Sequence, residues 1–287
     1  MPRPLLAVDA PSLLYRAFHA LPDSITDDDG RPVNALLGSL NLVLYEVERH
    51  EPRAVVMCFG VDAAEYRVEL YAGYHAERPP VPDALGPQFA DAPALYEAFG
   101  WYTASSPVFE ADDLLGSYAA VEDEAGGEAL ILTGDRDMFQ CVGERVKVLY
   151  VRTGGARGAE LVDAAGVEER YGIAPALVPD FIALRGDPSD GIPGAKGVGE
   201  KTAADLLRRH GSLEAAIAGA VREKAPRLRG VLRESADELR TFKEMALLRR
   251  LEVERPPDRA TDRAAGAQAV LARGMKRLAE RLASSPA

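Results

Sequence analysis

The most informative segment of the chain reads Ala129-Leu130-Ile131-Leu132-Thr133-Gly134-Asp135-Arg136-Asp137. Its first half is short and aliphatic, which predicts a buried β-strand over Ala129–Leu132. Runs of the same kind predict three further strands, at Leu5–Val8, Ala54–Phe59 and Val146–Tyr150. Ligands bind in open α/β sheets just beyond the carboxyl ends of the strands. The aspartates that end this segment therefore mark the edge of the sheet where we expect a functional site.

The segments between these strands carry helical periodicity. Apolar residues recur at spacings of three and four in Asn34–Arg49, and similar patterns cover Ala92–Phe99 and Ala111–Glu124. Strands that alternate with helices favour a mostly parallel sheet covered on both faces. Chain reversals are predicted at Gly100, Gly126-Gly127 and Gly154-Gly155.

The remainder of the chain is predicted to be helical. Helical patterns cover Val162–Tyr171, Leu177–Arg185, Lys201–His210, Leu213–Ala218 and Ala225–Leu248, and the tail adds one more helix. The predicted fold class is therefore α/β, with a core over residues 1–160 and a helical region over residues 161–287.

The net charge of −11 is unevenly distributed along the chain. Residues 1–195 hold 14 Lys and Arg against 32 Asp and Glu, whereas residues 196–287 hold 20 against 13. A basic C-terminal third joined to an acidic body is a weak indication of nucleic-acid contact. Ordinary variation of a solvated surface explains the charges equally well.

The composition is that of an ordinary globular protein. Apolar residues make up 47% of the chain, and no apolar run approaches the roughly 18 residues of a membrane-spanning helix. The start, Met1-Pro2-Arg3-Pro4, lacks signal-peptide architecture, so we expect a cytoplasmic protein with no membrane contact. For Cys58 and Cys141, free thiols are favoured over a disulfide, which stays an open alternative.

Acidic residues gather at the predicted edge of the sheet. Asp9 follows the first strand, and Asp135 and Asp137 follow the third. Two further groups lie at a helix start and in a turn: Glu110, Asp112 and Asp113, then Asp187 and Asp190. Each group taken alone is explained by helix capping, the helix dipole or a turn. Together they favour divalent metal ions, because converged carboxylates repel one another unless cations hold them.

A pair of such metal ions suits the in-line attack of water on a phosphodiester. The sequence holds no comparable pattern for zinc binding, nucleotide binding or a serine nucleophile. Its four histidines are scattered, which disfavours a zinc site. A Walker loop and a G-x-S-x-G elbow are both absent from the sequence.

A second motif lies in Gly191–Leu207, where Gly197 and Gly199 flank one apolar residue just before a helix. Small residues let backbone N–H groups approach a phosphate, and the helix N-terminus adds the positive end of a dipole. Lys196 and Lys201 add charge. A common turn is the alternative, but the flanking residues predict a helix-hairpin-helix at about residues 185–210, an element that contacts the duplex backbone without reading bases.

In this order, these residues resemble the bacterial 5′ nucleases, which include the N-terminal domain of DNA polymerase I and are related to the flap endonucleases. The resemblance spans roughly residues 5–250. It implies a PIN-like 5′ nuclease fold and, since no polymerase domain follows, a stand-alone form. Its motifs are Asp9 with Leu14-Tyr15-Arg16-Ala17-Phe18, Tyr66-Arg67, Tyr74 with Arg78-Pro79-Pro80, Glu110-Ala111-Asp112-Asp113, Thr133 to Asp137, and Gly186-Asp187-Pro188-Ser189-Asp190 through Thr202.

The resemblance implies two or more divalent metal ions, Mg²⁺ or Mn²⁺. The ligands of the first would be Asp9, Glu110 and Asp112, with Asp113 nearby. The ligands of the second would be Asp135, Asp137 and Asp190, with Asp187 beside it. The catalytic set that it implies is Asp9, Arg16, Arg78 and Asp135.

The resemblance also implies contacts to DNA. Arg16 and Arg78 would touch the phosphates of the scissile strand, and Tyr15 or Phe18 would stack on a terminal base. Residues 68–100 would form an arch or gateway, and the hairpin would hold the downstream duplex with K⁺ or Na⁺. The other implied DNA contacts are Arg67, His75, Lys196, Gly197, Gly199, Lys201 and Thr202.

Two positions depart from the family pattern. The family has Phe-Asp at the end of the second strand, where this chain has Phe59-Gly60, and Asp62 is a nearby substitute. The gateway has Tyr-Lys in the family but Tyr74-His75 here, and histidine is neutral over much of the physiological pH range. Loss of one ligand weakens a metal site without abolishing it, so we predict an active nuclease that is slow or favours Mn²⁺.

The predicted activity is hydrolysis of DNA near a 5′ end or flap junction by a monomer, with a 5′-phosphorylated product. Two alternatives stay open. A DNA-binding protein with an eroded active site would bind branched DNA without cutting it, as Gly60 and His75 suggest. A ribonuclease is the second alternative, although the helix-hairpin-helix favours duplex DNA.

Overall fold

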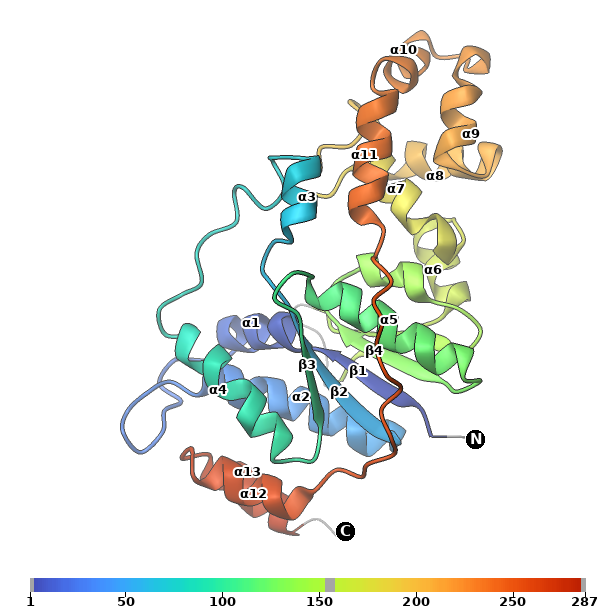
Figure 1. The fold of residues 1–287 in the computed structure, drawn as a ribbon. Helices are drawn as coiled ribbons and strands as arrows, with labels where there is room; N and C mark the ends of the chain where they lie inside the picture. The colour runs from blue at the N-terminus through green and yellow to red at the C-terminus, as the bar shows by residue number, and fades with distance from the viewer. Residues whose placement is uncertain (1–2, 153–157, 285–287) are drawn as a thin grey trace.

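The computed structural model describes residues 3–152 and 158–284. Its centre is a six-stranded sheet with the strand order β3-β2-β1-β4-β5-β6 (Figure 1). Strands β1 to β5 run parallel, and β6 runs antiparallel to β5. The strands are β1 (Leu5–Asp9), β2 (Ala54–Phe59), β3 (Tyr102–Ser105), β4 (Ala129–Thr133), β5 (Val146–Tyr150) and β6 (Glu160–Val162).

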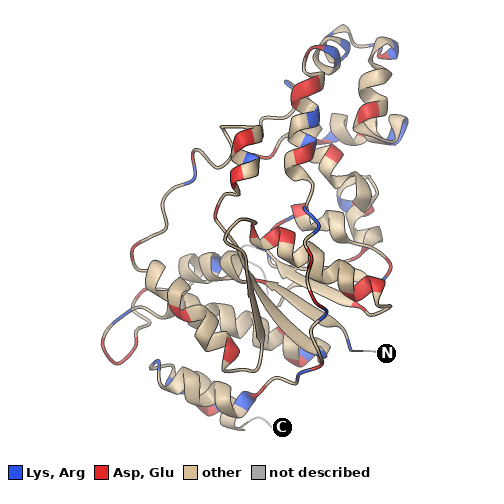
Figure 2. Cartoon of the chain, in the orientation of Figure 1, with Lys and Arg blue, Asp and Glu red and all other residues tan. Residues whose placement is uncertain are grey.

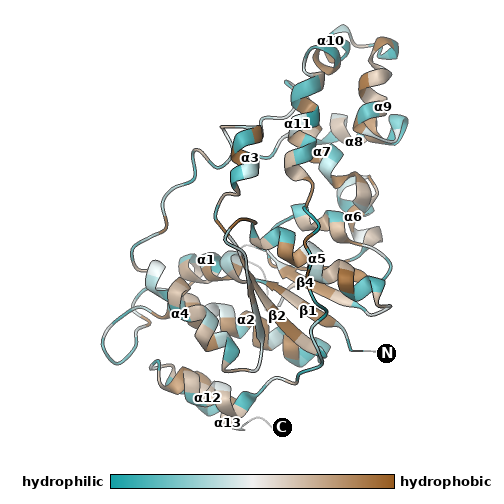
Figure 3. Cartoon of the chain, in the orientation of Figure 1, coloured by the Kyte–Doolittle hydropathy of each residue, from teal (hydrophilic) through white to brown (hydrophobic). Residues whose placement is uncertain are grey.

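The sheet is covered on both faces, as expected for central strands that are apolar up to their last residues, Asp9 and Thr133 (Figure 3). Every residue of β1 and β4 is buried. Alternate residues of β1 face opposite sides, so Leu5 and Ala7 join one core cluster and Leu6 and Val8 the other. Helices α1 (Ala10–Ala20), α2 (Asn34–His50) and α4 (Gly86–Glu97) cover one face, and α5 (Ala111–Glu124) and the 3₁₀ helix η1 (Asp137–Cys141) cover the other.

A helical region continues the core cluster that lies beneath α5. In Figure 1 it rises above the sheet, with α3 (Glu65–Leu70) beside α11. Its elements are α6 (Ala164–Tyr171), η2 (Pro175–Leu177), α7 (Val178–Arg185), α8 (Glu200–His210), α9 (Leu213–Ala218), η3 (Ala220–Arg222), α10 (Pro226–Glu234) and α11 (Ala236–Ala246).

The chain then returns to the α/β core through an extended segment, residues 247–262, which we call the C-terminal strap (Figure 1). The strap leads into α12 (Arg263–Leu271) and α13 (Lys276–Ser284). Both helices pack into the core cluster of α2 and α4, where Gly266 lies against the Phe99 ring. The last part of the predicted helical region thus lies against the α/β core.

The structure confirms the α/β class and the four predicted strands, and it adds two more. β3 is a half-exposed edge strand, and β6 has three residues, so neither has the buried apolar run that marks the others. The helix predicted to begin at Val162 begins at Ala164, after Asp163 caps it through Gly166 N.

Two helical predictions are wrong in detail, and one helix was not predicted. The single helix predicted over residues 225–248 is two helices that meet at Ser235, a residue type that competes with the helical backbone for hydrogen bonds. The tail holds two helices, because Gly274 adopts a φ of 74° and turns the chain between them. Helix α1, which begins directly after β1, has no counterpart in the prediction.

The predicted reversal at residues 154–155 lies outside the described residues. Within the described residues, no helix combines the length and the apolar character needed to cross a membrane.

Candidate active site

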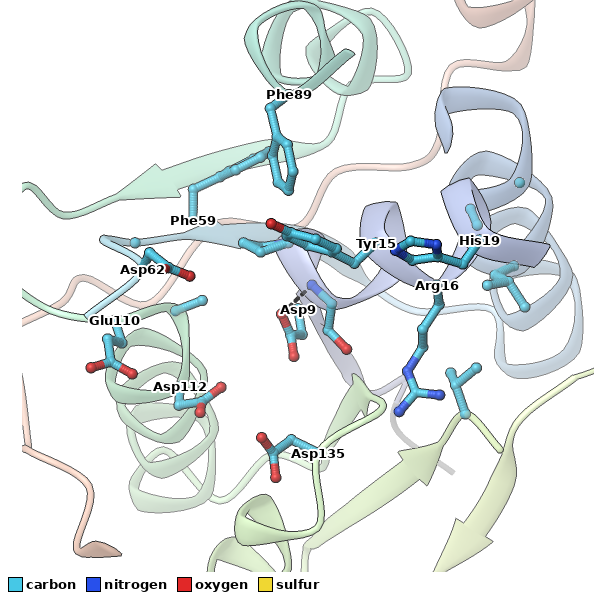
Figure 4. A pocket seen from close by; sticks show the side chains of 18 of the residues that line it. Asp9, Tyr15, Arg16, His19, Phe59, Asp62, Phe89, Glu110, Asp112 and Asp135 are labelled. Carbon is cyan, nitrogen blue, oxygen red and sulfur yellow. Dashed lines mark hydrogen bonds between the residues drawn. The ribbon is translucent and has the colours of Figure 1, made fainter. Parts of the chain in front are cut away.

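A cleft opens at the carboxyl ends of β1 and β4, the neighbouring strands from which the sheet winds in opposite directions. Such a switch point is where open α/β sheets bind ligands. Figure 4 shows Asp9, Asp112 and Asp135 around its centre, with Glu110 and Asp62 to one side. The acidic residues that line the cleft are Asp9, Glu48, Asp62, Glu110, Asp112, Asp135, Asp137 and Asp190.

Asp9 ends β1 and caps α1, so the fold itself fixes its position. Its Oδ1 accepts a hydrogen bond from Ser12 N at 3.0 Å, and its Oδ2 accepts one from Thr133 Oγ1 at 2.6 Å. Burial nevertheless raises the pKa of Asp9 above its ordinary value. Thr133 is a positioning residue that the sequence analysis missed. The signal for it is the strand register, which pairs Val8 with Leu132 and so places Thr133 beside Asp9.

Asp135 and Asp137 follow β4 in a tight turn. Thr133 Oγ1 accepts a hydrogen bond from Asp135 N at 2.9 Å, and Asp135 Oδ1 accepts one from Asp137 N at 2.9 Å. Burial, aided by repulsion from Asp190, raises the pKa of Asp135 to about 7. Burial and the charge of Asp135 raise the pKa of Asp137 well above its usual range.

Glu110 and Asp112 lie at the start of α5. The Oε1 atom of Glu110 accepts a hydrogen bond from Ala64 N, and its Oε2 atom accepts one from the Tyr74 hydroxyl, both at 2.8 Å. Arg67 Nη1 lies 2.8 Å from the same Oε2. Burial and then the nearby Asp135 and Asp9 raise the pKa of Asp112 well above its usual range.

Two predicted acidic residues do not line the cleft. Asp113 is fully buried and accepts hydrogen bonds from Arg249 N at 2.7 Å and Arg67 Nη2 at 3.2 Å. Asp187 holds its own turn, because its carboxylate accepts hydrogen bonds from Ser189 N and Arg185 Nη2, both at 2.9 Å.

Arg67, a predicted DNA contact, lines the cleft but is engaged by protein groups. It is 3% exposed, and its guanidinium binds Glu110, Asp113 and the carbonyl oxygen of Met245. Burial of a charged side chain requires such partners. Its contacts make it a clamp that holds the start of α5.

Residues 71–78, part of the gateway predicted over residues 68–100, lie against the acidic turn at residues 187–192. His75 Nε2 lies 3.2 Å from Asp190 Oδ1, and its Nδ1 lies 2.8 Å from the carbonyl oxygen of Asp62. Arg78 Nη1 donates to Asp62 Oδ1 at 2.9 Å. His75 and Arg78 therefore link Asp62 and Asp190 at the rim of the cleft.

Gly60 leaves no room for the side chain that the family has there. A Cβ atom built on Gly60 would lie 2.4 Å from Ala111 N and 2.6 Å from the carbonyl oxygen of Phe109. The backbone at the start of α5 therefore fills this space. Asp62 is 63% exposed and paired with Arg78, so it lines the cleft without replacing the missing carboxylate at that point.

Aromatic side chains line the other side of the cleft (Figure 4). The Tyr15 ring lies between His19, at a centroid distance of 6.4 Å, and Phe89, at 5.6 Å. Phe18 does not line the cleft, which favours Tyr15 as the stacking residue. Phe89 of α4 is an aromatic contact that the sequence analysis missed. Arg16 Nη2 donates to the carbonyl oxygen of Gly134 at 2.7 Å, and its charge acts to lower the pKa of Asp9.

The predicted hairpin joins α7 to α8. Gly197 has a φ of 79°, and Gly199 caps α8 with a φ of −95°. The side chains of Lys196 and Lys201 are exposed, and Thr202 is half-buried at the first turn of α8. Figure 2 shows several Lys and Arg residues on helices α8 to α11, the part of the molecule that holds the hairpin.

The cleft residues suit divalent metal ions by their chemistry. As placed, no three Asp, Glu, His or Cys side chains within residues 3–152 and 158–284 are close enough together to hold one ion. The donors are nevertheless all carboxylates, the type that Mg²⁺ and Mn²⁺ prefer. Burial and mutual repulsion raise the pKa of several of them, and a bound cation would relieve both effects.

The likeness to known proteins extends over most of the chain. Family models match the "5′-3′ exonuclease, N-terminal resolvase-like domain" over residues 4–172 and the "5′-3′ exonuclease, C-terminal SAM fold" over residues 173–264. A 5′-3′ exonuclease of Mycobacterium tuberculosis is 40% identical, covering 80% of this chain and 78% of the relative. One from Streptomyces coelicolor is 41% identical, covering 78% and 77%. A thermostable DNA polymerase I of Thermus thermophilus is 36% identical, covering 90% of this chain and 31% of the relative.

Solved structures share the fold. The bacteriophage T5 5′-exonuclease with bound zinc has a TM-score of 0.70 and 16% identity, covering 98% of this chain and 97% of the other. The T5 flap endonuclease in a complex with DNA and metal ions has a TM-score of 0.72 and 15% identity, covering 98% of each chain. The sequence matches, which are far closer in identity, establish that the chain belongs to the 5′-3′ exonuclease family.

Proposed function

We propose that this 5′-3′ exonuclease hydrolyses DNA phosphodiesters near 5′ ends and flap junctions, with two divalent metal ions held by the cleft carboxylates. The observation that carries this proposal is the convergence of six predicted metal ligands, which come from four separate chain segments, on one cleft. The proposed metal ligands are Asp9, Glu110, Asp112, Asp135, Asp137 and Asp190. When bound, the metal ions would ionise the attacking water and stabilise the leaving oxygen.

The protein's own residues prepare the site for such ions. Thr133 and Ser12 fix Asp9, while Tyr74 and Arg67 fix Glu110. Oriented donors of this kind hold metal ligands in a productive geometry.

DNA would enter past the cations and aromatic rings at the rim of the cleft. Arg16 and Arg78 line the cleft and are suited to bind phosphates of the scissile strand. Tyr15 and Phe89 offer faces on which a base can stack. The hairpin would hold the backbone of the downstream duplex, with K⁺ or Na⁺ at its loop.

A DNA-binding protein with a weakened active site is the second candidate. It is favoured by Gly60, whose side-chain space is filled by backbone, and by the engagement of Asp62 with Arg78. Such a protein would bind the same branched DNA and leave it uncut.

A nicked duplex with a 5′ flap, labelled at its 5′ end, separates these candidates. Incubation with Mg²⁺, Mn²⁺ or EDTA should release a labelled flap-sized fragment or mononucleotide only when metal is present. Tight binding without cleavage under either metal would instead support the weakened form. A matched RNA flap tests the ribonuclease alternative, which predicts faster cleavage of RNA than of DNA.

A further inference from the structure

A cation from outside the helix-hairpin-helix lies on its loop. Arg227 belongs to α10 and lies 30 residues after Gly197 in the sequence. A Cβ atom built on Gly197 would lie 2.7 Å from Arg227 Nη2 and 3.1 Å from its Cζ. The guanidinium therefore lies directly against the backbone of the hairpin loop.

The donors of Arg227 remain available for a ligand. Its side chain is exposed, and within the described part of the chain it takes part in no ion pair or hydrogen bond. Lys196 and Lys201 share both properties. Arginines of the neighbouring helices are instead neutralised, as Arg240 is by Glu214 at 2.9 Å and Arg209 by Glu223 at 2.6 Å. Three unpaired cations, Arg227, Lys196 and Lys201, thus lie at or beside the loop.

The loop surface beside these cations is open. Gly199 has no atom within 4 Å of the place where a Cβ would lie, and its φ of −95° suits any residue. Neither packing nor backbone conformation requires glycine there. The close approach of a ligand to the backbone would explain it, and the start of α8 presents N–H groups at this point.

We propose that Arg227 is a third phosphate-binding cation of the hairpin, so that α10 grips the same duplex as the loop. This inference rests on the proposed DNA-binding function of the hairpin. The partner is the sugar-phosphate backbone of duplex DNA, because a guanidinium with free donors matches a phosphate in charge and in geometry. Because it involves only phosphates, this contact would bind duplexes of any base sequence with the same affinity.

The test compares Arg227→Ala with Arg233→Ala in the full-length protein. Both substitutions remove one exposed, unpaired cation from α10, but Arg233 has no contact with Gly197. The dissociation constant of a blunt DNA duplex is measured in EDTA, to prevent cleavage, over a series of salt concentrations. Lys196→Ala reports whether the hairpin itself binds the duplex, and circular dichroism confirms that each variant is folded.

Loss of one phosphate contact should lower the slope of log K against log salt by about 0.9, and weaken binding roughly tenfold near 0.1 M salt. We expect this for Arg227→Ala and a much smaller change for Arg233→Ala. An unchanged slope in Arg227→Ala, with weaker binding in Lys196→Ala, would overturn the proposal for Arg227 and leave DNA binding by the hairpin intact. Equal losses in the two arginine variants would also overturn it, because they would show a general effect of charge. Wild-type protein that does not bind the duplex would overturn the proposed function as well.

Discussion

At the scale of single residues, the cleft depends on the side chains that hold its carboxylates. Thr133 connects Asp9 of β1 to the turn that carries Asp135, since its hydroxyl donates to the first and accepts from the backbone of the second. Glu110 is held by an ion pair with Arg67 and by a hydrogen bond from the Tyr74 hydroxyl. The carboxylates could be predicted from the sequence because they follow strands. Their partners could not, because they come from distant segments that only strand order and helix packing bring together.

Substitution of Thr133 by valine should slow cleavage without unfolding the protein. Valine keeps the shape of threonine but cannot donate to Asp9, and the loss of such a supporting hydrogen bond typically costs about 10–100-fold in metal affinity or activity. Cleavage rates measured across a series of Mg²⁺ concentrations should show this loss. Thr133→Ser keeps the hydroxyl and should retain most of the activity. A valine variant as fast as the wild type would show that this hydrogen bond does not position Asp9.

Restoration of the family's aspartate at Gly60 should not improve the enzyme. Its Cβ would collide with the backbone of residues 109–111, so we expect a loss of about 1–3 kcal/mol in the free energy of unfolding. Gly60→Ala meets the same obstacle and serves as the control for the collision alone. Thermal unfolding and flap cleavage check both variants. Faster cleavage by Gly60→Asp at unchanged stability would mean that the space is open and merely lacks a ligand.

At the scale of elements, the two glycines of the hairpin loop differ in backbone conformation and in the space around them. Gly197 has a left-handed backbone and lies against Arg227, whereas Gly199 has an ordinary backbone and open space around it. The motif and its helix were predictable from local sequence. Arg227 was not, because its sequence position says nothing about its contact with the loop.

Substitution of Gly199 by alanine should therefore separate stability from binding. We expect the free energy of unfolding to fall by only about 1 kcal/mol, because alanine is a poorer N-cap of α8 than glycine. Duplex binding should weaken, because a methyl group would stand between the phosphate and the backbone. Urea unfolding and a duplex titration in EDTA measure the two effects. Unchanged affinity would show that the DNA backbone does not approach Gly199.

At the scale of the whole molecule, the C-terminal strap ties the helical region to the α/β core. Glu122 of α5 is buried and pairs with Arg53 of the core and with Arg255 of the strap. Arg53 also donates to the carbonyl oxygen of Pro256 at 2.7 Å. The sheet and its helices were predictable from hydrophobic periodicity. The strap was not, since an extended segment held by ion pairs and backbone hydrogen bonds has no periodic signal.

Replacement of Glu122 by glutamine should cost up to about 3–5 kcal/mol at neutral pH, because it leaves the buried guanidinium of Arg53 with the exposed Asp258 as its remaining ionic partner. Burial alone would raise the pKa of Glu122, but hydrogen bonds from Arg53 and Arg255 outweigh burial and hold it below its ordinary value. A lowered folded-state pKa stabilises the protein above the unfolded pKa, and that contribution is lost as pH falls through the folded value. The difference in the free energy of unfolding between the wild type and the variant should therefore shrink as the pH falls.

Urea unfolding of the wild type and of Glu122→Gln between about pH 3 and pH 7 measures how their stability difference changes with pH. Glu124→Gln is the matched control, because Glu124 is 68% exposed and its pair with Arg250 should contribute less than about 1 kcal/mol. Equal stability of the Glu122 and Glu124 variants at neutral pH would contradict a structural role for the buried cluster.

The most direct test of the proposed active site is the cleavage rate of Asp135→Ala on the 5′-flap substrate with saturating Mg²⁺, measured beside its duplex affinity in EDTA. Asp135 lines the cleft and is a proposed ligand of the second metal ion, so its loss should slow cleavage by at least about 100-fold while duplex affinity stays near that of the wild type. Full activity in this variant would show that the catalytic metal ions are not held by these carboxylates.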